Sequence, residues 1–421
     1  MQPDWWPGEV HDQFTEWAAS QGIVMNGVAP ARFPGRGLGM IATRNIMKDE
    51  KIVIVPLDAM VTSQCLPEAF RRKFPEGTST HALYAAFFTH GDPEDLEKYE
   101  LWRKTWPHPQ DFEDSMPILW PQALRASNSK YDSHSTQSVL LPPSISGSWD
   151  GIPKNRGGHE YDTFHQNLLP QQEKRLHDAW STVVSVFPDT DWDTFAYHWL
   201  IVNTRSFFYL MPGDEAPEDR NDAMALLPFA DYFNHSDVAC NVNFDGANYV
   251  FRATKNYEQG EEIYMSYGAH PNDFLFAEYG FFLDDNEYES LYLDDIIFQD
   301  FDASQHEELD LQQYYGNYQL TATGACFRTE IAACIKYMTR RDWRNYVLGH
   351  SMKGVDDNKT QATIQEWIKI YAKEADRKIA TLEAMKSSGE NQIHSGKIDM
   401  LLKRWKQIKH LCDEALKADS C

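Results

Sequence analysis

The chain has 421 residues, 42% of them hydrophobic, so it is long enough to bury a substantial core in two or three domains. Its formal net charge is −24 at pH 7, which argues against direct nucleic-acid binding, because phosphate contacts need a basic face. No stretch approaches the roughly 18 consecutive apolar residues of a membrane-spanning helix. The six cysteines form neither a CxxC pair nor a disulfide framework. We therefore expect an intracellular protein, cytoplasmic or nuclear, that binds neither nucleic acid nor a membrane directly.

The first sixty residues predict one helix and two short strands. Apolar residues at helical spacing indicate an amphipathic helix over 11–20. Strand-like text follows at 40–46 and 51–56, joined by a polar turn. The second of these strands is rich in β-branched residues, which favours a buried strand.

Sequence patterns typical of helices dominate from about residue 57 to 204. Buried or amphipathic helices are predicted over 82–88, 171–186 and 192–205. A stretch rich in Ser, Pro and Gly separates the first from the second, over 126–158, and is interpreted as a long loop.

Strands return after residue 205 and the chain then ends in helices. Strands are predicted over 239–244 and 248–253, and Asp245-Gly246 between them is a strong hairpin signal. Apolar residues spaced i, i+3, i+4 and i+7 predict one helix around 364–371 and another around 398–405. The polar linker over 387–396 makes these two helices an expected antiparallel pair.

Three short segments carry the most specific signal. An apolar run leads into a corner at Asn234-His235-Ser236, and an aromatic-rich, strand-like segment over 262–268 ends in Tyr267-Gly268. Near the N-terminus stands Arg36-Gly37-Leu38-Gly39. In combination these segments resemble the SET-domain methyltransferases, and the overall layout is similar to the Rubisco large-subunit lysine methyltransferase-like subfamily.

The resemblance implies an α+β fold, with a β-rich SET core split by a helical insert and followed by an all-helical C-terminal domain resembling a substrate-binding domain. The implied segments are 1–60 for the N-terminal helix and first part of the core, 61–204 for the insert with its long loop, 205–290 for the second part of the core, and 291–421 for the C-terminal domain. The implied cofactor is S-adenosylmethionine, and no metal is required.

The glycine segment has three interpretations. A dinucleotide fingerprint would need a helix after the glycines, but the text that follows is strand-like. A plain tight turn is the second interpretation, because glycine tolerates positive φ. The resemblance implies the third, in which the main chain of Arg36, Gly37 and Leu38 contacts the cofactor.

The Asn-His corner also has alternatives. It can be a turn whose side chains satisfy local backbone groups, or half of a metal site with Cys240, although further ligands are lacking nearby. The resemblance assigns Asn234 and His235 to cofactor binding. It also places Arg205, at the return from insert to core, near the cofactor carboxylate.

The resemblance assigns the reaction itself to tyrosines. Tyr267 matches the near-invariant active-site tyrosine of the family, whose hydroxyl lies close to the transferred methyl. Tyr279 fits a second catalytic and substrate-binding tyrosine, and Phe281 a cofactor-binding ring. Phe207, two residues after the arginine, stands where lysine-directed members carry an aromatic residue and a histidine-directed relative carries asparagine.

The sequence thus predicts an S-adenosylmethionine-dependent enzyme that methylates a lysine of a non-histone protein by direct in-line transfer. Protein-histidine methylation, a non-catalytic SET-like scaffold and, remotely, a Rossmann oxidoreductase are the alternatives. An acidic run follows the tyrosines and is by default a solvated face. It also suggests a groove for a basic segment of a partner, such as a ribosomal or translation protein; the run comprises Asp284, Asp285, Glu287, Glu289, Asp294, Asp295 and Asp300.

Overall fold

The computed structural model describes residues 3–125, 139–155, 158–217, 222–387 and 394–418. The chain divides into two compact units. Unit 1 comprises residues 1–112 and 173–269, and unit 2 comprises residues 113–172 and 270–421. Helices α6 (Pro109–Ser115) and α9 (Leu168–Val186) have residues in both.

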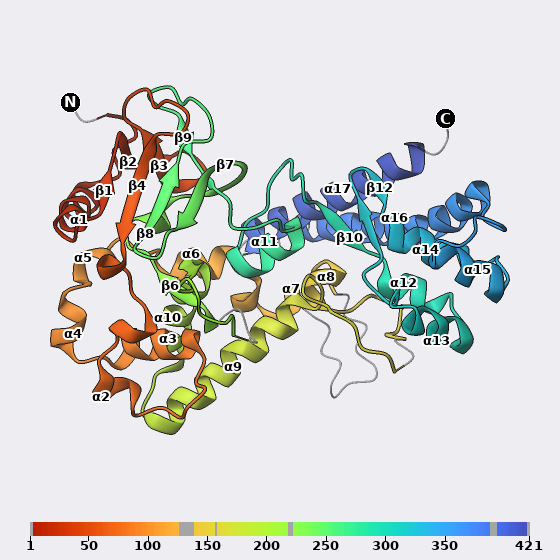
Figure 1. The fold of residues 1–421 in the computed structure, drawn as a ribbon, viewed down its shortest axis with the longest axis horizontal. Coiled ribbons are helices and arrows are strands. Elements are labelled where there is room, and N and C mark those ends of the chain that lie inside the picture. Colours follow the sequence, from red (N-terminus) through yellow and green to blue (C-terminus); the bar gives the residue numbers. More distant parts are fainter. Residues whose placement is uncertain (1–2, 126–138, 156–157, 218–221, 388–393, 419–421) are drawn as a thin grey trace. The chain divides into compact units, whose positions relative to one another are not determined.

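In the described residues of unit 1, three small antiparallel sheets form the strand framework (Figure 1). Their strand orders are β1-β4-β8-β7, β2-β3-β9 and β5-β6. The β-branched residues Ile52, Val53 and Val55 of β4 are fully buried, as the sequence predicts. The strands are β1 (Val24–Met25), β2 (Val28–Phe33), β3 (Gly37–Ala42), β4 (Lys51–Pro56), β5 (Ser206–Phe208), β6 (Met224–Leu226), β7 (His235–Phe244), β8 (Asn248–Arg252) and β9 (Glu262–Ile263).

The predicted hairpin is confirmed. Strands β7 and β8 pair antiparallel, and the Asp245 carboxylate accepts the main-chain N–H of Asn248 at 2.7 Å. Gly246 has a φ of +94°, a conformation that side-chain-bearing residues rarely adopt. Strand β7 begins earlier than predicted, at His235, so the polar corner runs directly into it.

The strand predicted over 40–46 is wrong at both ends, since β3 spans Gly37–Ala42. The chain turns after β3 because the Glu50 carboxylate accepts hydrogen bonds from the Arg44 guanidinium at 2.7 Å and from the main-chain N–H of Met47 at 2.6 Å. Strands β3 and β4 consequently belong to different sheets.

Helices of unit 1 follow the predicted pattern. The expected segments 11–20, 82–88 and 192–205 correspond to α1, α3 and α10, and the last two pack against each other. The helical elements are α1 (Glu9–Ser20), η1 (Leu57–Ala59), η2 (Ser63–Cys65), α2 (Glu68–Arg71), α3 (Thr80–His90), α4 (Pro93–Glu97), α5 (Glu100–Arg103), α10 (Trp192–Arg205) and η5 (Ala230–Tyr232).

The C-terminal part of the chain is mainly helical, as predicted, but it is not all-helical, because a small antiparallel sheet of order β10-β11-β12 lies within unit 2 (Figure 1). These strands have two or three residues each, too few for an alternating pattern to be visible in the sequence. The elements of unit 2 are η3 (Pro117–Leu119), α7 (Gln122–Arg125), α8 (Pro143–Ser146), α11 (Asn272–Tyr279), β10 (Ser290–Tyr292), α12 (Asp294–Gln299), α13 (Ala303–Leu311), β11 (Gln319–Thr321), β12 (Gly324–Ala325), α14 (Phe327–Cys334), α15 (Arg340–Val347), α16 (Asp357–Ser387) and α17 (Ser395–Ala418).

The two predicted C-terminal helices are α16 and α17, and they run antiparallel. Ion pairs join Lys386 to Asp399 at 2.5 Å and Lys409 to Asp376 at 3.6 Å, so the start of one helix lies beside the end of the other. Most of the linker predicted between them, residues 388–393, lies outside the described residues.

The long loop predicted over 126–158 is described only in part. Residues 126–138 and 156–157 lie outside the described residues, and the part between them contains the single-turn helix α8.

Within the described ranges, no helix is both long and apolar enough to cross a bilayer. The predicted segment boundaries at 60, 204 and 290 stay predictions.

Candidate functional site

The glycine segment forms the turn into β3, and it allows other segments to pack closely against that strand. Gly37 has a φ of +78° and pairs with Phe33 across the β2–β3 hairpin. At Gly39 there is no room for a side chain: an added Cβ would lie 2.6 Å from Glu262 Oε1 and 2.8 Å from Asn234 Nδ2. Main chain at this point therefore touches two segments that are distant in the sequence.

Asn234 binds this same strand. Its Nδ2 donates to the carbonyl oxygen of Leu38 at 2.8 Å and to Glu262 Oε1 at 2.8 Å. The structure thus brings together two of the predicted cofactor-binding residues, one from the glycine segment and one from the polar corner.

The segment predicted as one strand over 262–268 is a strand only over Glu262–Ile263. Beyond it the chain runs beside the start of β7, where the N–H of Met265 donates to the carbonyl of Asn234 at 2.9 Å and the N–H of Cys240 donates to the carbonyl of Tyr264 at 2.7 Å. The segment that ends in Tyr267 is therefore paired with β7 through isolated β-bridges and not through a continuous β-ladder.

His235 orients the main chain of Tyr267. The Nδ1 atom of His235 accepts the N–H of Tyr267 at 3.0 Å, so this nitrogen carries no proton and the ring is the neutral Nε2–H tautomer. Burial lowers the pKa of His235, which favours the same neutral form. In this arrangement His235 acts as a hydrogen-bond acceptor that fixes the tyrosine backbone.

The hydroxyl of Tyr267 donates to the carbonyl oxygen of Phe233 at 2.8 Å. Burial raises the pKa of Tyr267 to about 12, so the phenol stays protonated near neutral pH. Because the hydroxyl hydrogen points at the Phe233 carbonyl, the direction of the oxygen lone pairs is fixed.

Arg205, at the last position of α10, contributes a cation to unit 1. Its Nε lies 3.7 Å from Asp231 Oδ2, and its side chain is 19% exposed. The indole of Trp102 donates to the same carboxylate oxygen at 2.9 Å. Burial raises the pKa of Asp231. Arg205 is thus held by a buried carboxylate and is not a freely solvated surface residue.

Phe207 lies on β5 among other rings. Its ring centroid is 6.2 Å from that of Tyr249 and 6.4 Å from that of Phe251. Phe251 in turn stacks on Phe233 with centroids 5.1 Å apart. Phe233 is also the residue whose main-chain carbonyl accepts from the Tyr267 hydroxyl, so the backbone links this aromatic group to the predicted active-site tyrosine.

Tyr279 and Phe281 belong to unit 2, at the C-terminal end of α11 and just after it. Their ring centroids are 6.3 Å apart, on either side of Gly280, which has a φ of +78° and ends the helix. The roles assigned to these two rings stay predictions.

Sequence reasoning missed the residues that join the glycine segment to the polar corner. The Glu262 carboxylate accepts from Asn234, from Tyr264 and from Arg36. Arg36 therefore turns its guanidinium onto Glu262 and over the ring of Phe33, leaving its main chain as the part that can face a ligand. The only signal in the sequence was an acidic residue on the strand that precedes the tyrosine.

Several members of the acidic run are used inside unit 2. The Glu289 carboxylate binds Arg404 at 2.6 Å, and Asp294 accepts the main-chain N–H of Asn317 at 2.6 Å. Asp300 binds Lys336 at 2.9 Å and the indole of Trp367. Glu289 and Asp294 therefore lie inside unit 2, whereas Asp300 is exposed but paired. Asp284, Asp285 and Glu287 form the exposed N-terminal end of the run.

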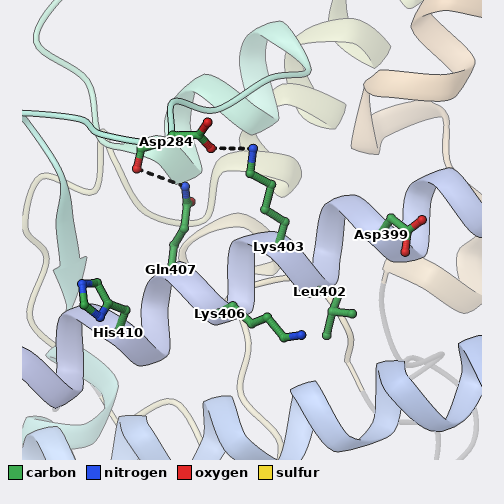
Figure 2. Close-up of a pocket in the computed structure, with 7 residues that line it drawn as sticks. All are labelled: Asp284, Asp399, Leu402, Lys403, Lys406, Gln407 and His410. Atoms are coloured by element: carbon green, nitrogen blue, oxygen red, sulfur yellow. Dashed lines mark hydrogen bonds and ion pairs between the residues drawn. The ribbon is translucent and has the colours of Figure 1, made fainter. Parts of the chain in front are cut away.

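A shallow groove on α17 lies beside the exposed end of this run (Figure 2). Figure 2 shows Lys403 reaching Asp284, with an Nζ–Oδ1 distance of 2.5 Å. Lys406 pairs with Glu383 at 3.1 Å. The two lysines of the groove are therefore neutralised, and none of the predicted catalytic or cofactor-binding residues lines it. Its lining comprises Asp284, Asp399, Leu402, Lys403, Lys406, Gln407 and His410.

Comparison with known protein families gives two matches. The SET-domain model matches residues 37–268. A second model, described as the C-terminal domain of ribosomal lysine N-methyltransferase 2, matches residues 289–418.

Curated relatives include the ribosomal lysine N-methyltransferase set11 of Schizosaccharomyces pombe, 38% identical over 170 residues, which are 40% of this chain and 42% of that protein. Ribosomal lysine N-methyltransferase 2 of Saccharomyces cerevisiae is 25% identical over 222 residues, which are 47% of this chain and 46% of that protein. The chain thus spans less than half the length of these two relatives. Human SET domain-containing protein 4 is 21% identical over 404 residues, covering 91% and 85%.

Among solved structures, Rubisco LSMT bound to AdoMet superimposes with a TM-score of 0.56 at 15% identity, covering 98% of this chain and 94% of that chain. The SET domain of LSMT bound to lysine and AdoHcy gives 0.52 at 14% identity, covering 96% and 91%. At these identities the similarity concerns the fold, and it agrees with the predicted α+β class.

Proposed function

This chain belongs to the SET-domain family, and from that membership and the geometry of unit 1 we propose that it is an S-adenosylmethionine-dependent protein-lysine N-methyltransferase. The observation that carries the proposal is the set of hydrogen bonds that joins the three motif segments to one another. Leu38 of the glycine segment binds Asn234, and the neighbouring His235 binds the main chain of Tyr267.

The residues present in unit 1 fit the proposed cofactor. Among the described residues no atom lies within 4 Å of a Cβ placed on Gly37, so the main chain there is open to a ligand, while Gly39 allows Asn234 and Glu262 to approach the strand closely. The Asn234 amide offers an acceptor for an ammonium group, and Arg205 offers a cation for a carboxylate. When bound, S-adenosylmethionine supplies a methyl group on a positively charged sulfur for direct in-line transfer.

Tyr267 aligns the reaction and does not act as a base. With a pKa of about 12 its hydroxyl is protonated at neutral pH, and its hydrogen is donated to Phe233. Its oxygen lone pairs remain the polar feature that can support a methyl group carrying partial positive charge. Fixing the tyrosine by two hydrogen bonds, one at its main chain and one at its hydroxyl, preorganises that feature before substrate arrives.

The acceptor amine must be neutral to react. A solvated lysine with a pKa of about 10.4 is roughly 0.04% neutral at pH 7. An aromatic environment lowers the pKa of an amine by desolvation. In the proposed site the half-buried ring of Phe207, which lies against the fully buried ring of Phe251, would supply such surroundings.

Phe207 supports lysine over histidine as the modified residue. An aromatic ring at this position adds apolar surface for an aliphatic lysine side chain, whereas a polar residue would favour an imidazole acceptor. Methyl transfer to a histidine peptide, with none to lysine peptides, would show that the choice is wrong.

The proposed substrate is a non-histone protein with a basic segment, and a ribosomal protein is the favoured class. Both fungal relatives described above carry the name ribosomal lysine N-methyltransferase, and so does the model matched by residues 289–418. Exposed carboxylates at Asp285 and Glu287 and the net charge of −24 favour a basic partner. Affinity for such a partner should weaken as salt rises, and a salt-independent affinity would remove the electrostatic argument.

The test is transfer of labelled methyl from S-adenosylmethionine to purified ribosomes and to a methylation-depleted lysate, comparing wild type with Tyr267→Phe. Wild type should label a discrete protein on lysine. The variant, which loses only the hydroxyl, should be slower by on the order of 100-fold.

Tyr257→Phe is the matched control, because Tyr257 is also buried in unit 1 but lies outside the three motif segments. It should label like the wild type. Absence of label in all samples, together with a failure of the wild type to bind S-adenosylhomocysteine, would favour a SET-like protein-binding scaffold instead.

A further inference from the structure

The buried carboxylate of Glu262 accepts hydrogen bonds from several residues of the unit 1 site. It lies on β9, where Glu262 pairs with Ile41 of β3, and its side chain is only 4% exposed. A carboxylate in such a place needs hydrogen-bond donors to offset the cost of leaving water.

Three donors surround it. Oε1 accepts from Asn234 Nδ2 at 2.8 Å, and Oε2 lies 2.8 Å from Arg36 Nη1 and accepts from the Tyr264 hydroxyl at 2.7 Å. Arg36 Nη1 also donates to the Tyr264 oxygen. One side chain thus ties the glycine segment, the polar corner and the segment that leads to Tyr267 to each other.

The contact decides how the Asn234 amide is presented. A primary amide has two N–H donors on its nitrogen, and here one goes to the Leu38 carbonyl and the other to Glu262. The amide cannot flip without losing both. Its oxygen is thereby fixed as the acceptor that Asn234 offers to a ligand, and a cofactor ammonium or amino group is the matching donor.

We propose that Glu262 is a positioning residue for cofactor binding: it sets the orientation of the Asn234 amide and the path of the Arg36–Gly39 main chain. This inference rests on the proposed function, because it assumes that those two segments hold S-adenosylmethionine. Glu262 itself has no role in the transfer step.

The test is Glu262→Gln, which keeps size and shape but puts an amide nitrogen where one carboxylate oxygen was. Either Asn234 or Arg36 then faces a second donor. The dissociation constant for S-adenosylhomocysteine, measured by calorimetry, should rise about tenfold. In methyl transfer the KM for S-adenosylmethionine should rise with little change in kcat, whereas Tyr267→Phe should lower kcat.

The control is Glu261→Gln. Glu261 is the preceding residue, its side chain is 41% exposed, and its carboxylate only accepts a local main-chain N–H and lies near Lys255. It should bind S-adenosylhomocysteine like the wild type.

Circular dichroism and a melting curve check that each variant is folded at the assay temperature. A folded Glu262→Gln protein with wild-type affinity would overturn the inference while leaving the proposed function intact. Failure of the wild type itself to bind S-adenosylhomocysteine would instead overturn the proposed function.

Discussion

At the scale of single residues, the sequence reveals those whose identity is tied to a short motif. Asn234, His235 and Tyr267 could be picked out in this way. The structure places His235 in contact with the main chain of Tyr267, and Asn234 in contact with Met265, two residues before the tyrosine. Glu262 could not, because it stands next to Glu261 and the two look alike in the sequence. Only pairing of β9 with β3 makes one of them buried at 4% exposure and leaves the other at 41%.

Gly39→Ala is expected to damage the site through one methyl group. The new Cβ would lie under 3.0 Å from Glu262, Asn234 and the ring of Phe33, so these groups must move apart. We expect a loss of about 1–3 kcal/mol in the free energy of unfolding and at least a roughly tenfold weaker affinity for S-adenosylhomocysteine. Urea titration and calorimetry measure the two quantities.

Gly396→Ala in α17 is the matched control. Apart from the backbone of α17 itself, no heavy atom of the described residues lies within 4 Å of a Cβ placed there, and alanine favours a helix over glycine. Gly396→Ala should leave the affinity for S-adenosylhomocysteine unchanged and should not lower the free energy of unfolding. Wild-type affinity in a folded Gly39→Ala protein would contradict the crowding argument.

At the scale of elements, long periodic segments were predictable and their charged contacts were not. Helices α16 and α17 follow from apolar spacing, but the sequence does not indicate that Arg404 of α17 is fully buried. Its guanidinium binds Asp273, at the start of α11, at 2.8 Å and Glu289 at 2.6 Å. Such long-range partners depend on packing, which no local pattern encodes, and this triad fixes α11, whose last residue is Tyr279.

Arg404→Met should destabilise unit 2 by about 3–5 kcal/mol, because it leaves the Asp273 and Glu289 carboxylates buried without their cation. Lys403→Met is the control on the same helix. Lys403 is 55% exposed and pairs with an exposed Asp284, so its loss should cost no more than about 1 kcal/mol. Urea titrations followed by far-UV circular dichroism compare the two, and equal costs would refute a structural role for the triad.

At the scale of the whole molecule, the fold class could be predicted because strands, a helical insert, strands again and a helical tail occur in that order along the chain. The core of unit 1 could not be predicted in the same detail. In it, His198 of α10 lies in a cluster with Phe88 and Trp106, and its Nδ1 is 2.9 Å from the hydroxyl of Thr89. Burial, with smaller effects of the Arg103 charge and His90, lowers the pKa of His198 to about 4 from its ordinary value of 6.5.

This histidine predicts a loss of stability in acid. Between pH 6.5 and about 4 the unfolded chain binds a proton at His198 that the folded chain does not, so stability falls as pH falls through this range. The contribution is on the order of 3 kcal/mol. His198→Asn should melt with a shallower dependence on pH between 6.5 and 4, measured by calorimetry. The exposed His410→Asn is the control, and an unchanged slope in both variants would contradict the prediction.

The bond between Asn234 and Leu38 also bears on how the protein is made. It joins positions 196 residues apart. At synthesis rates of about 5–20 residues per second, the ribosome needs roughly 10–40 s to deliver the second partner after the first. Throughout that interval β3 has its β2 neighbour but not β9, so one edge of a nascent sheet stays open to other chains. The strand that carries the glycine segment is therefore also a part of the growing chain that needs protection until its distant partners emerge.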